Sequence, residues 1–366
     1  MVDVRQRVAV AMSGGVDSSV AAALLREQGH EMFGLMLRLW NEPSQNGKRH
    51  NRCCTPDAVN RAEKVAAMLD IPFYVLDARK VFHQSVVQFF LDGYAAGVTP
   101  NPCLECNRHI RWGYLLSKAL GMGATHLASG HYARVRKQGE KYQLRRGQDT
   151  QKDQSYALSM LGQRELSRTI FPIGALTKME TRSLARQFKL PVTDYPESQD
   201  LCFLANNNYR DFVRRHSPES LNPGPIVNRD GNCIGQHSGL PLYTIGQRKG
   251  IGISSREPLY VLAKDCSSNN LVVGSRTELG SYRLRAGDVN WTSGNPPSNA
   301  LRALVQIRYG SRPSPARLTP VGTDTVEVEF DLEMRDITPG QAAVFYQGDV
   351  LVGGGTIEPS VKPEAL

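Results

Sequence analysis

Residues 7–29 of the sequence, RVAVAMSGGVDSSVAAALLREQG, join an apolar run to an apolar segment of helical character through the loop SGGVDSS. Gly14 and Gly15 permit positive φ angles and let another group approach the backbone closely. The N–H groups of such a turn and of the following helical turn converge on one point, which favours an anion such as phosphate. Serine hydroxyls add donors, whereas Asp17 is unfavourable beside a bare phosphate and indicates a metal ion or a capping role. The stretch predicts an anion-binding loop between a strand and a helix.

This loop is not a Walker A sequence, because the lysine of GxxxxGK[ST] is missing. A plain helix cap on a flexible turn is one interpretation of the two glycines. The complete string SGGVDSS after a strand-like run is more specific, and it resembles the pyrophosphate-loop signature of the ATP-pyrophosphatases. That resemblance implies an enzyme that cleaves ATP between the α and β phosphates and adenylates an oxygen of its substrate.

Outward from the loop, strand-like and helix-like segments alternate over roughly the first 200 residues. The predicted strands are residues 7–12, 30–40, 73–78 and 126–132, and the predicted helices are residues 18–29, 55–70 and 81–97. Thr55 and Pro56 form a helix-start signal, and Gly29 is placed to end a helix. The alternation predicts an α/β, Rossmann-like parallel sheet with helices on both faces, whose ligands bind beyond the carboxyl ends of the strands.

The rest of the 366-residue chain has a different texture. From about residue 206 it is rich in Gly and Pro with short β-like runs, and from about residue 281 apolar and polar residues alternate between turns. We therefore expect an ATP-binding catalytic domain over 1–205, a small central domain over 206–280, and an antiparallel, barrel-like β domain over 281–366.

Charge indicates a polyanionic partner. The formal net charge is +9, and residues 131–152 hold seven Lys or Arg against two acids. Residues 301–320 hold four arginines and no acid. A solvated basic face explains either segment alone, but two such segments favour a nucleic acid. We expect a cytoplasmic protein without a membrane segment, because no apolar run approaches about 18 residues and the N-terminal residues have no long apolar region.

Four of the seven cysteines form two close sets, Cys53–Cys54 and Cys103–Cys106. Three interpretations of the second set stay open: half of a zinc site, part of an iron–sulfur site, or a reactive thiol that moves sulfur. Cys202 is either a loop thiol or a small buried residue, and Cys233 and Cys266 have no assigned role.

A series of motifs beyond the loop resembles the tRNA-specific 2-thiouridylase family over about residues 7–358. In chain order they are SGGVDSSV, NPCLECNRHIRW, SGHYA, KDQSYALSML, SQDLCFL, HSGLPLYTIGQRKGIGI, QIRYG and GQAAVFYQGDVLVGGG. The resemblance implies that ATP adenylates the oxygen on carbon 2 of the wobble uridine. Persulfide sulfur then replaces that oxygen, giving 2-thiouridine, AMP and pyrophosphate.

The resemblance also implies roles for individual residues. Cys106 would be the nucleophile and Cys202 the persulfide carrier, and the two would form a transient disulfide. The implied ATP-binding residues are Ala11, Met12, Ser13, Gly14, Gly15, Val16, Asp17, Ser18, Leu37 and Gly130. The implied target-base residues are Asn101, Pro102 and Cys103. The implied tRNA-binding residues are His131, Lys152, Asp153, Gln154, Arg308, Tyr309 and Gln341.

The partners implied by the family are ATP with Mg²⁺, a tRNA for Lys, Glu or Gln, and a cysteine desulfurase or sulfur-carrier protein; we expect no structural metal. Two residues depart from the pattern: Leu37 stands where many relatives have methionine, and Cys103 where some have aspartate. Two rival functions are an amide- or amidine-forming ligase with the same loop, which needs no thiols, and a metal-stapled RNA-binding module without chemistry.

Overall fold

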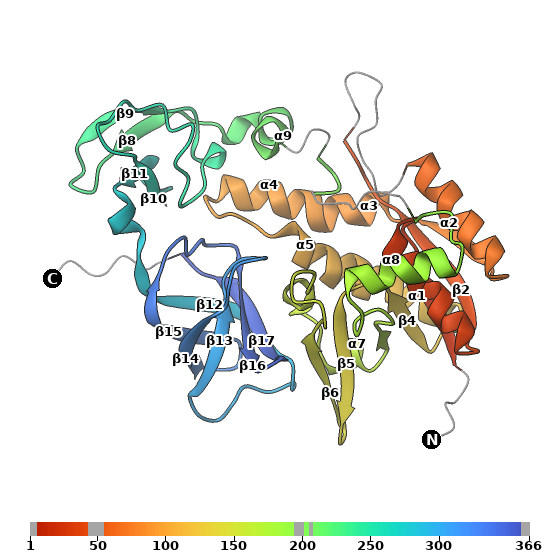
Figure 1. The fold of residues 1–366 in the computed structure, drawn as a ribbon. Coiled ribbons are helices and arrows are strands. Elements are labelled where there is room, and N and C mark those ends of the chain that lie inside the picture. Colours follow the sequence, from red (N-terminus) through yellow and green to blue (C-terminus); the bar gives the residue numbers. More distant parts are fainter. Residues whose placement is uncertain (1–5, 43–54, 194–200, 205–207, 360–366) are drawn as a thin grey trace.

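A computed structural model describes residues 6–42, 55–193, 201–204 and 208–359 (Figure 1). The N-terminal part holds a sheet with strand order β3-β2-β1-β4-β7, and every neighbouring pair is parallel. Its strands are β1 (Arg7–Ala11), β2 (Glu31–Arg38), β3 (Phe73–Asp77), β4 (His126–Ser129) and β7 (Thr169–Ile170). The predicted parallel sheet is confirmed.

The predicted helices of this part are also found. They are α1 (Val16–Glu27), α2 (Pro56–Met68), and a third helix that is divided into α3 (Arg79–Phe82), a π-helical turn (His83–Val87) and α4 (Gln88–Ala95). The Thr55 hydroxyl accepts a hydrogen bond from the Ala58 N–H at 3.1 Å, which confirms the helix-start signal. Gly29 follows α1 with a φ of 79°.

Helices cover both faces of the sheet, as predicted. Val8 and Val10 point to one face and pack with α1 and α2, whereas Ala9 points to the other and packs with Trp112 and Leu115. That second covering layer consists of α5 (Pro102–Glu105), a π-helical segment (Cys106–Leu115) and α6 (Leu116–Gly121). The helices α7 (Gln163–Leu166) and α8 (Lys178–Gln187) follow.

The central part begins with α9 (Tyr209–His216) and continues as a sheet of order β10-β11-β8-β9. Its strands are β8 (Gly224–Val227), β9 (Cys233–His237), β10 (Tyr260–Asp265) and β11 (Asn270–Gly274). It packs around its own apolar core, which includes Ile226, Val261 and Leu271.

The C-terminal strands form an antiparallel barrel. They are β12 (Ser281–Trp291), β13 (Leu301–Gln306), β14 (Ser314–Val321), β15 (Thr325–Met334), β16 (Ala342–Gln347) and β17 (Val350–Ile357). The order is β12-β15-β14-β13-β16-β17, and pairing of β12 with β17 closes the ring. The expectation of an antiparallel, barrel-like C-terminal part is confirmed.

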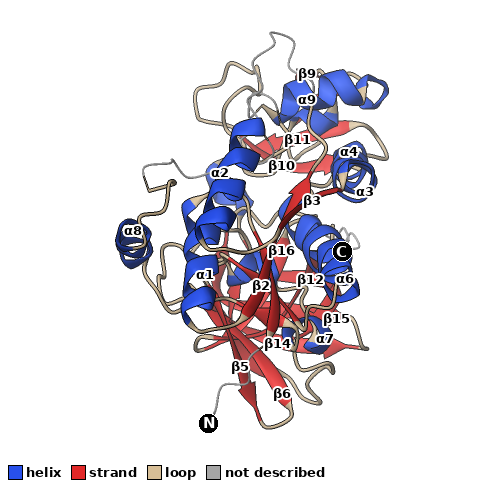
Figure 2. Ribbon diagram, turned by 90° about the vertical axis from the view of Figure 1, so that its right-hand side faces the viewer, coloured by secondary structure: helices blue, strands red, loops and turns tan. Residues whose placement is uncertain are grey.

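One feature of the barrel was not expected. The hairpin of β5 (Ala133–Gln138) and β6 (Lys141–Arg146), from the N-terminal part, extends the barrel sheet through pairing of Leu144 with Leu351 in β17. Figures 1 and 2 show this hairpin reaching alongside the barrel. The first and last parts of the chain therefore share one hydrogen-bonded sheet. In the part of the chain that the structure describes, no helix is long and apolar enough to cross a membrane.

Candidate active site

The loop between β1 and α1 is closed in by two neighbouring segments. Gly14 has a φ of 70°, and a Cβ atom there would lie 2.3 Å from the Ala58 carbonyl oxygen of α2. A Cβ atom on Gly130, just after β4, would lie 2.7 Å from the Ser18 nitrogen. Only glycine permits these approaches, so both positions shape the N-terminus of α1.

Hydroxyl groups of the loop are turned inward. The Ser18 hydroxyl accepts a hydrogen bond from the Ser13 N–H at 3.2 Å, and the Ser19 hydroxyl donates to the Gly15 carbonyl at 2.8 Å. Gly15 is the N-cap residue of α1, and no side-chain hydrogen bond caps this helix end in the described part of the chain. Its first N–H groups therefore remain available to an anion.

Asp17 forms an ion pair at this helix end. Lys178 Nζ lies 2.7 and 2.8 Å from its two carboxylate oxygens, and the Tyr132 hydroxyl donates to it at 2.8 Å. The Lys178 side chain is only 11% exposed. Sequence reasoning considered a metal or a cap for Asp17 and missed Lys178, because nothing local marks this lysine except its place after the helix-start residue Thr177.

The thiol-bearing residues gather at another core. Cys106 and Cys202 are partly buried, and both pack against the same apolar cluster, which includes Phe90, Phe203 and Phe212. Phe203, adjacent to Cys202, is only 1% exposed. Two cysteines that are distant in sequence are therefore held against one wall. Leu37 packs against this cluster and also against the apolar core that includes Ala9 and Trp112.

Asn101, Pro102 and Cys103 form the start of α5. The Asn101 side-chain oxygen accepts a hydrogen bond from the Cys103 N–H at 3.2 Å, and Cys103 is exposed. This helix contacts the segment that carries Tyr156, whose hydroxyl donates to the Ala342 carbonyl at 3.0 Å. Burial raises the pKa of Tyr156, so this hydroxyl stays protonated.

The residues implied to bind tRNA fall into two groups. Arg308 and Tyr309 are exposed, and the Tyr309 ring centroid lies 6.1 Å from that of Tyr156, beside the target-base residues. The Gln341 side chain donates to the Thr99 carbonyl at 2.8 Å, which ties the barrel to the segment leading into Asn101.

His131, in contrast, is an interior residue. It is 7% exposed and contacts Arg111 at 2.6 Å and Ser129 at 2.8 Å. Burial, reinforced by the charge of Arg111, holds its pKa well below the ordinary value, so the ring is neutral. Since Arg111 can only donate, Nε2 accepts, and the Nδ1–H therefore donates to Ser129.

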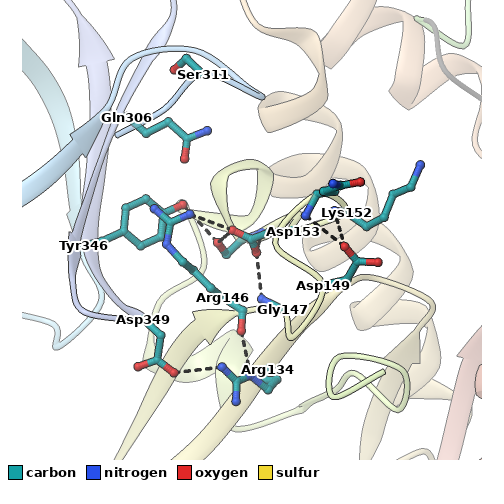
Figure 3. A network of polar contacts seen from close by, with 12 residues as sticks. Arg134, Arg146, Gly147, Asp149, Lys152, Asp153, Gln306, Ser311, Tyr346 and Asp349 are labelled. Atoms are coloured by element: carbon teal, nitrogen blue, oxygen red, sulfur yellow. Dashed lines mark hydrogen bonds and ion pairs between the residues drawn. The ribbon is translucent and has the colours of Figure 1, made fainter. Parts of the chain in front are cut away.

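Asp153 and Gln154 also have their side chains engaged within the protein, and Figure 3 shows the network around Asp153. The Asp153 carboxylate accepts hydrogen bonds from the Gly147 N–H at 2.9 Å, from Arg146 at 3.2 Å and from the Ser155 hydroxyl at 2.9 Å. The Gln154 side chain accepts from the Tyr132 N–H at 3.0 Å.

Lys152 is oriented differently from these neighbours. Its N–H donates to Asp149 at 3.2 Å, and Figure 3 shows its side chain extending away from the network. The side chains of these adjacent residues thus point in different directions, and the Asp153 carboxylate stabilises the turn.

Within the ranges described above, no group of three or more His, Cys, Asp or Glu side chains could hold a metal ion. Cys53 and Cys54 lie outside these ranges, so the zinc interpretation that includes them has no structural counterpart to report.

Comparisons with protein families assign all three parts. The model described as the tRNA methyl transferase HUP domain matches residues 6–206. The model described as the tRNA methyl transferase PRC-barrel domain matches residues 210–275, and the aminomethyltransferase beta-barrel domain matches residues 281–357.

Curated relatives match nearly the whole chain. The tRNA-specific 2-thiouridylase MnmA of Chloroflexus aurantiacus is 49% identical over 98% of this chain and 99% of its own length. The protein of the same name from Carboxydothermus hydrogenoformans is 46% identical over 97% of this chain and 98% of its own length.

Solved structures are more distant. A 4-thiouridine synthetase in complex with RNA and ATP is 15% identical, with a TM-score of 0.37 over 59% of this chain and 51% of that chain. The NMN synthetase of Francisella tularensis is 18% identical, with a TM-score of 0.33 over 57% of this chain and 71% of that chain. These values are too low to support an inference about function.

Proposed function

Because the chain belongs to the family of tRNA-specific 2-thiouridylases, we propose that it replaces the oxygen on carbon 2 of the wobble uridine of tRNA by sulfur. The observation that carries this proposal is the 49% identity over 98% of the chain, which includes the pyrophosphate loop and both thiol-bearing motifs. The tRNAs for Lys, Glu and Gln are the proposed substrates.

ATP binds at the N-terminus of α1. The uncapped N–H groups receive the pyrophosphate oxygens, while Gly14 permits the close approach of α2 and Gly130 the close approach of the segment after β4. The complete proposed set is Ala11, Met12, Ser13, Gly14, Gly15, Val16, Asp17, Ser18, Leu37 and Gly130. Lys178 joins this set, because its ammonium group lies at the same helix end and can neutralise phosphate charge.

Mg²⁺ accompanies ATP in the proposed reaction. The donor set suits this ion, since Mg²⁺ in nucleotide sites takes one or two carboxylates and completes its shell with phosphate oxygens and water. Asp17 is the carboxylate that would hold it, in exchange for the contact with Lys178. The ion would supply charge neutralisation on the phosphates.

Adenylation converts a poor leaving group into a good one. The carbonyl oxygen on carbon 2 attacks the α phosphate and pyrophosphate leaves, so that AMP becomes the group that sulfur displaces. The base must leave the anticodon stack to reach the enzyme. Asn101, Pro102 and Cys103 receive it, at the start of α5, which contacts the segment that carries Tyr156.

Sulfur arrives as a persulfide on Cys202, supplied by a cysteine desulfurase or a carrier protein. The Cys106 thiolate attacks the Cys202 sulfur, forming the Cys106–Cys202 disulfide and releasing hydrosulfide. Hydrosulfide attacks carbon 2 and expels AMP. An external thiol then reduces the disulfide. Support comes from the packing of both cysteines against one apolar cluster.

The proposed tRNA-binding residues divide into direct contacts and supporting residues. Lys152, Arg308 and Tyr309 contact the RNA directly, whereas Asp153, Gln154 and His131 act through the shape of the surface that they support. Gln341 holds the segment leading into Asn101 and contacts the RNA beside it.

The test is a thiolation assay. Protein, ATP, Mg²⁺, a desulfurase with cysteine and unmodified tRNA are incubated, and nucleosides are analysed by mass spectrometry. We expect 2-thiouridine and AMP from the unchanged protein, loss of thiolation in Cys106→Ser and Cys202→Ser, and full activity in the matched control Cys233→Ser. AMP formation without thiolated tRNA, or activity of the Cys106→Ser/Cys202→Ser double variant, would point to the rival ligase function instead.

A further inference from the structure

The chain has a cleft of about 360 Å³ where its three parts meet, separate from the nucleotide loop. It is lined by Thr99, which follows α4, by Arg210 of α9, and by Arg308 and Gln341 of the barrel. The central part adds the turn Thr244–Gln247. Its volume is at the lower end of the range of about 300–1,000 Å³ that small-ligand pockets occupy, which suits one nucleotide.

Arg210 is held in position at this cleft. Its Nε donates to the Leu242 carbonyl at 2.8 Å, one Nη donates to the Gln247 side chain at 2.9 Å, and its guanidinium lies 5.1 Å from the Tyr209 ring centroid. These contacts fix the plane of the guanidinium. A further hydrogen bond from it to a ligand therefore costs little side-chain entropy. A pre-organised guanidinium suits phosphate, which it binds with directed, charge-assisted hydrogen bonds.

Charge in the cleft favours an anion. Arg210 and Arg308 both line it, and the remaining lining side chains are amides, hydroxyls and one isoleucine. The Asp336 carboxylate packs closely against the Cα of Gly246, so one negative charge borders the turn. Two guanidinium groups beside one carboxylate leave a net positive wall.

The location of the cleft indicates which anion it binds. Gln341 donates to the carbonyl of Thr99 at 2.8 Å, and Thr99 stands two residues before Asn101, where the target base is proposed to bind. Arg308 and Gln341 are themselves proposed tRNA contacts, so the cleft continues that surface into the central part. A nucleotide adjacent to the target uridine in the RNA chain therefore lies within its reach.

We propose that this cleft binds the ribose-phosphate of a nucleotide flanking the target uridine, with Arg210 as its phosphate ligand. The inference rests on the proposed function, since it assumes tRNA as the substrate. Because phosphate contacts carry no sequence information, Arg210 contributes equally to every tRNA that the enzyme accepts.

The experiment measures the salt dependence of tRNA binding by the full-length chain. In Arg210→Gln we expect weaker binding to all substrate tRNAs and a slope of log K against log salt that is smaller by about one. Arg210→Lys, which keeps the charge, should retain the slope. Arg229→Gln is the matched control, because Arg229 is an exposed arginine of the same part of the chain, 72% accessible, and does not line the cleft.

A second arm locates the phosphate. Anticodon stem-loops that carry one uncharged methylphosphonate at successive positions around the target are bound to each protein. One flanking position should weaken binding to the unchanged protein but not to Arg210→Gln, which shows that the two changes remove the same contact. This arm compares each protein with itself, so it stays informative if Arg210→Gln is less stable.

The outcomes separate the two proposals. If the unchanged protein does not bind tRNA, the proposed function itself fails. If it binds tRNA but Arg210→Gln has the same slope, or no phosphate position is coupled to Arg210, the cleft inference is overturned. If Arg210→Gln keeps tRNA binding and thiolation from free sulfide but loses thiolation from the desulfurase, the cleft is a protein-docking surface and our assignment is wrong.

Discussion

At the nucleotide end of the site, Asp17 is fixed by Lys178 and Tyr132 through polar contacts of 2.7 and 2.8 Å. At the thiol end, Cys106 and Cys202 lie against a core of aromatic rings. Charges are positioned by opposite charges in the first case, and thiols by packing in the second. Since the two ends depend on different forces, substitutions should damage adenylation and sulfur transfer separately.

The largest effect is expected at Lys178. Lys178→Met removes the cation beside the pyrophosphate loop, and loss of one such stabilising group typically lowers kcat by about 100- to 1,000-fold. AMP release in the presence of tRNA and sulfide measures this step. Lys178→Arg should recover part of the activity because it keeps the charge.

The control for this prediction is Lys64→Met, an exposed lysine of α2, which should leave AMP release unchanged. Unchanged AMP release in Lys178→Met would mean that the ion pair with Asp17 is only structural. The distinction between a charge-positioned end and a packing-positioned end would then be lost.

Substitution of Phe203 should have the opposite effect: it should slow sulfur transfer and leave adenylation unchanged. Its ring lies 6.0 Å from that of Phe82, 5.3 Å from Phe90 and 5.4 Å from Phe212, so it anchors the residue next to Cys202. Phe203→Leu leaves a gap and misplaces the thiol, and misplacement by about 1 Å can cost about 100-fold in rate. We expect slower thiolation and slower Cys106–Cys202 disulfide formation with a mild oxidant, and unchanged AMP release in a single turnover.

The matched variant for Phe203 is Phe188→Leu, a partly buried phenylalanine that packs on the nucleotide side of the sheet. It should lower the thermal midpoint without slowing disulfide formation. Equal slowing in both variants would show that general loosening, and not the anchoring of Cys202, controls the thiol step.

Sequence reasoning was most successful where the chemistry is contiguous. The stretch from Ser13 to Ser19 joins a strand to a helix as predicted, with its last four residues in the first turns of α1, because glycine conformations and helix-start rules act locally. Lys178 was missed because its contact with Asp17 depends on how α8 packs, and no local pattern encodes that. The pairing of β6 with β17 was missed for the same reason, since it joins Leu144 to Leu351.

The family resemblance identified residues that are expected to bind tRNA, but not the direction in which their side chains point. Asp153 and His131 were both expected at the RNA surface, and both have their polar atoms engaged inside the protein. Orientation is decided by partners such as Gly147 and Arg111, which the motif does not name. Their assignment as RNA contacts stays a prediction, and the structure favours a supporting role for each.

Asp153→Asn tests that supporting role through stability. The amide cannot satisfy the Gly147 N–H, Ser155 and Arg146 together, and each buried group left without a partner costs about 1–3 kcal/mol. We expect a lower thermal midpoint and weaker tRNA binding, with the salt slope of binding unchanged. A smaller slope at an unchanged midpoint would mean that Asp153 acts at the RNA surface itself.

Substitution of Lys152 should have the smallest effect. In contrast to Asp153→Asn, it should change the salt slope of tRNA binding and not the thermal midpoint. Figure 3 shows the Lys152 side chain extending away from the Asp153 network, and Lys152→Ala keeps the backbone N–H that donates to Asp149 while it removes one positive charge. The thermal midpoint should stay the same, while the salt slope of tRNA binding falls by about one. Adjacent residues would then differ in kind: one stabilises the surface and the other contacts the RNA. A fall in the thermal midpoint of Lys152→Ala comparable to that of Asp153→Asn would instead show that the whole turn is structural, and the direct RNA contacts would have to come from Arg308, Tyr309 and the cleft beside them.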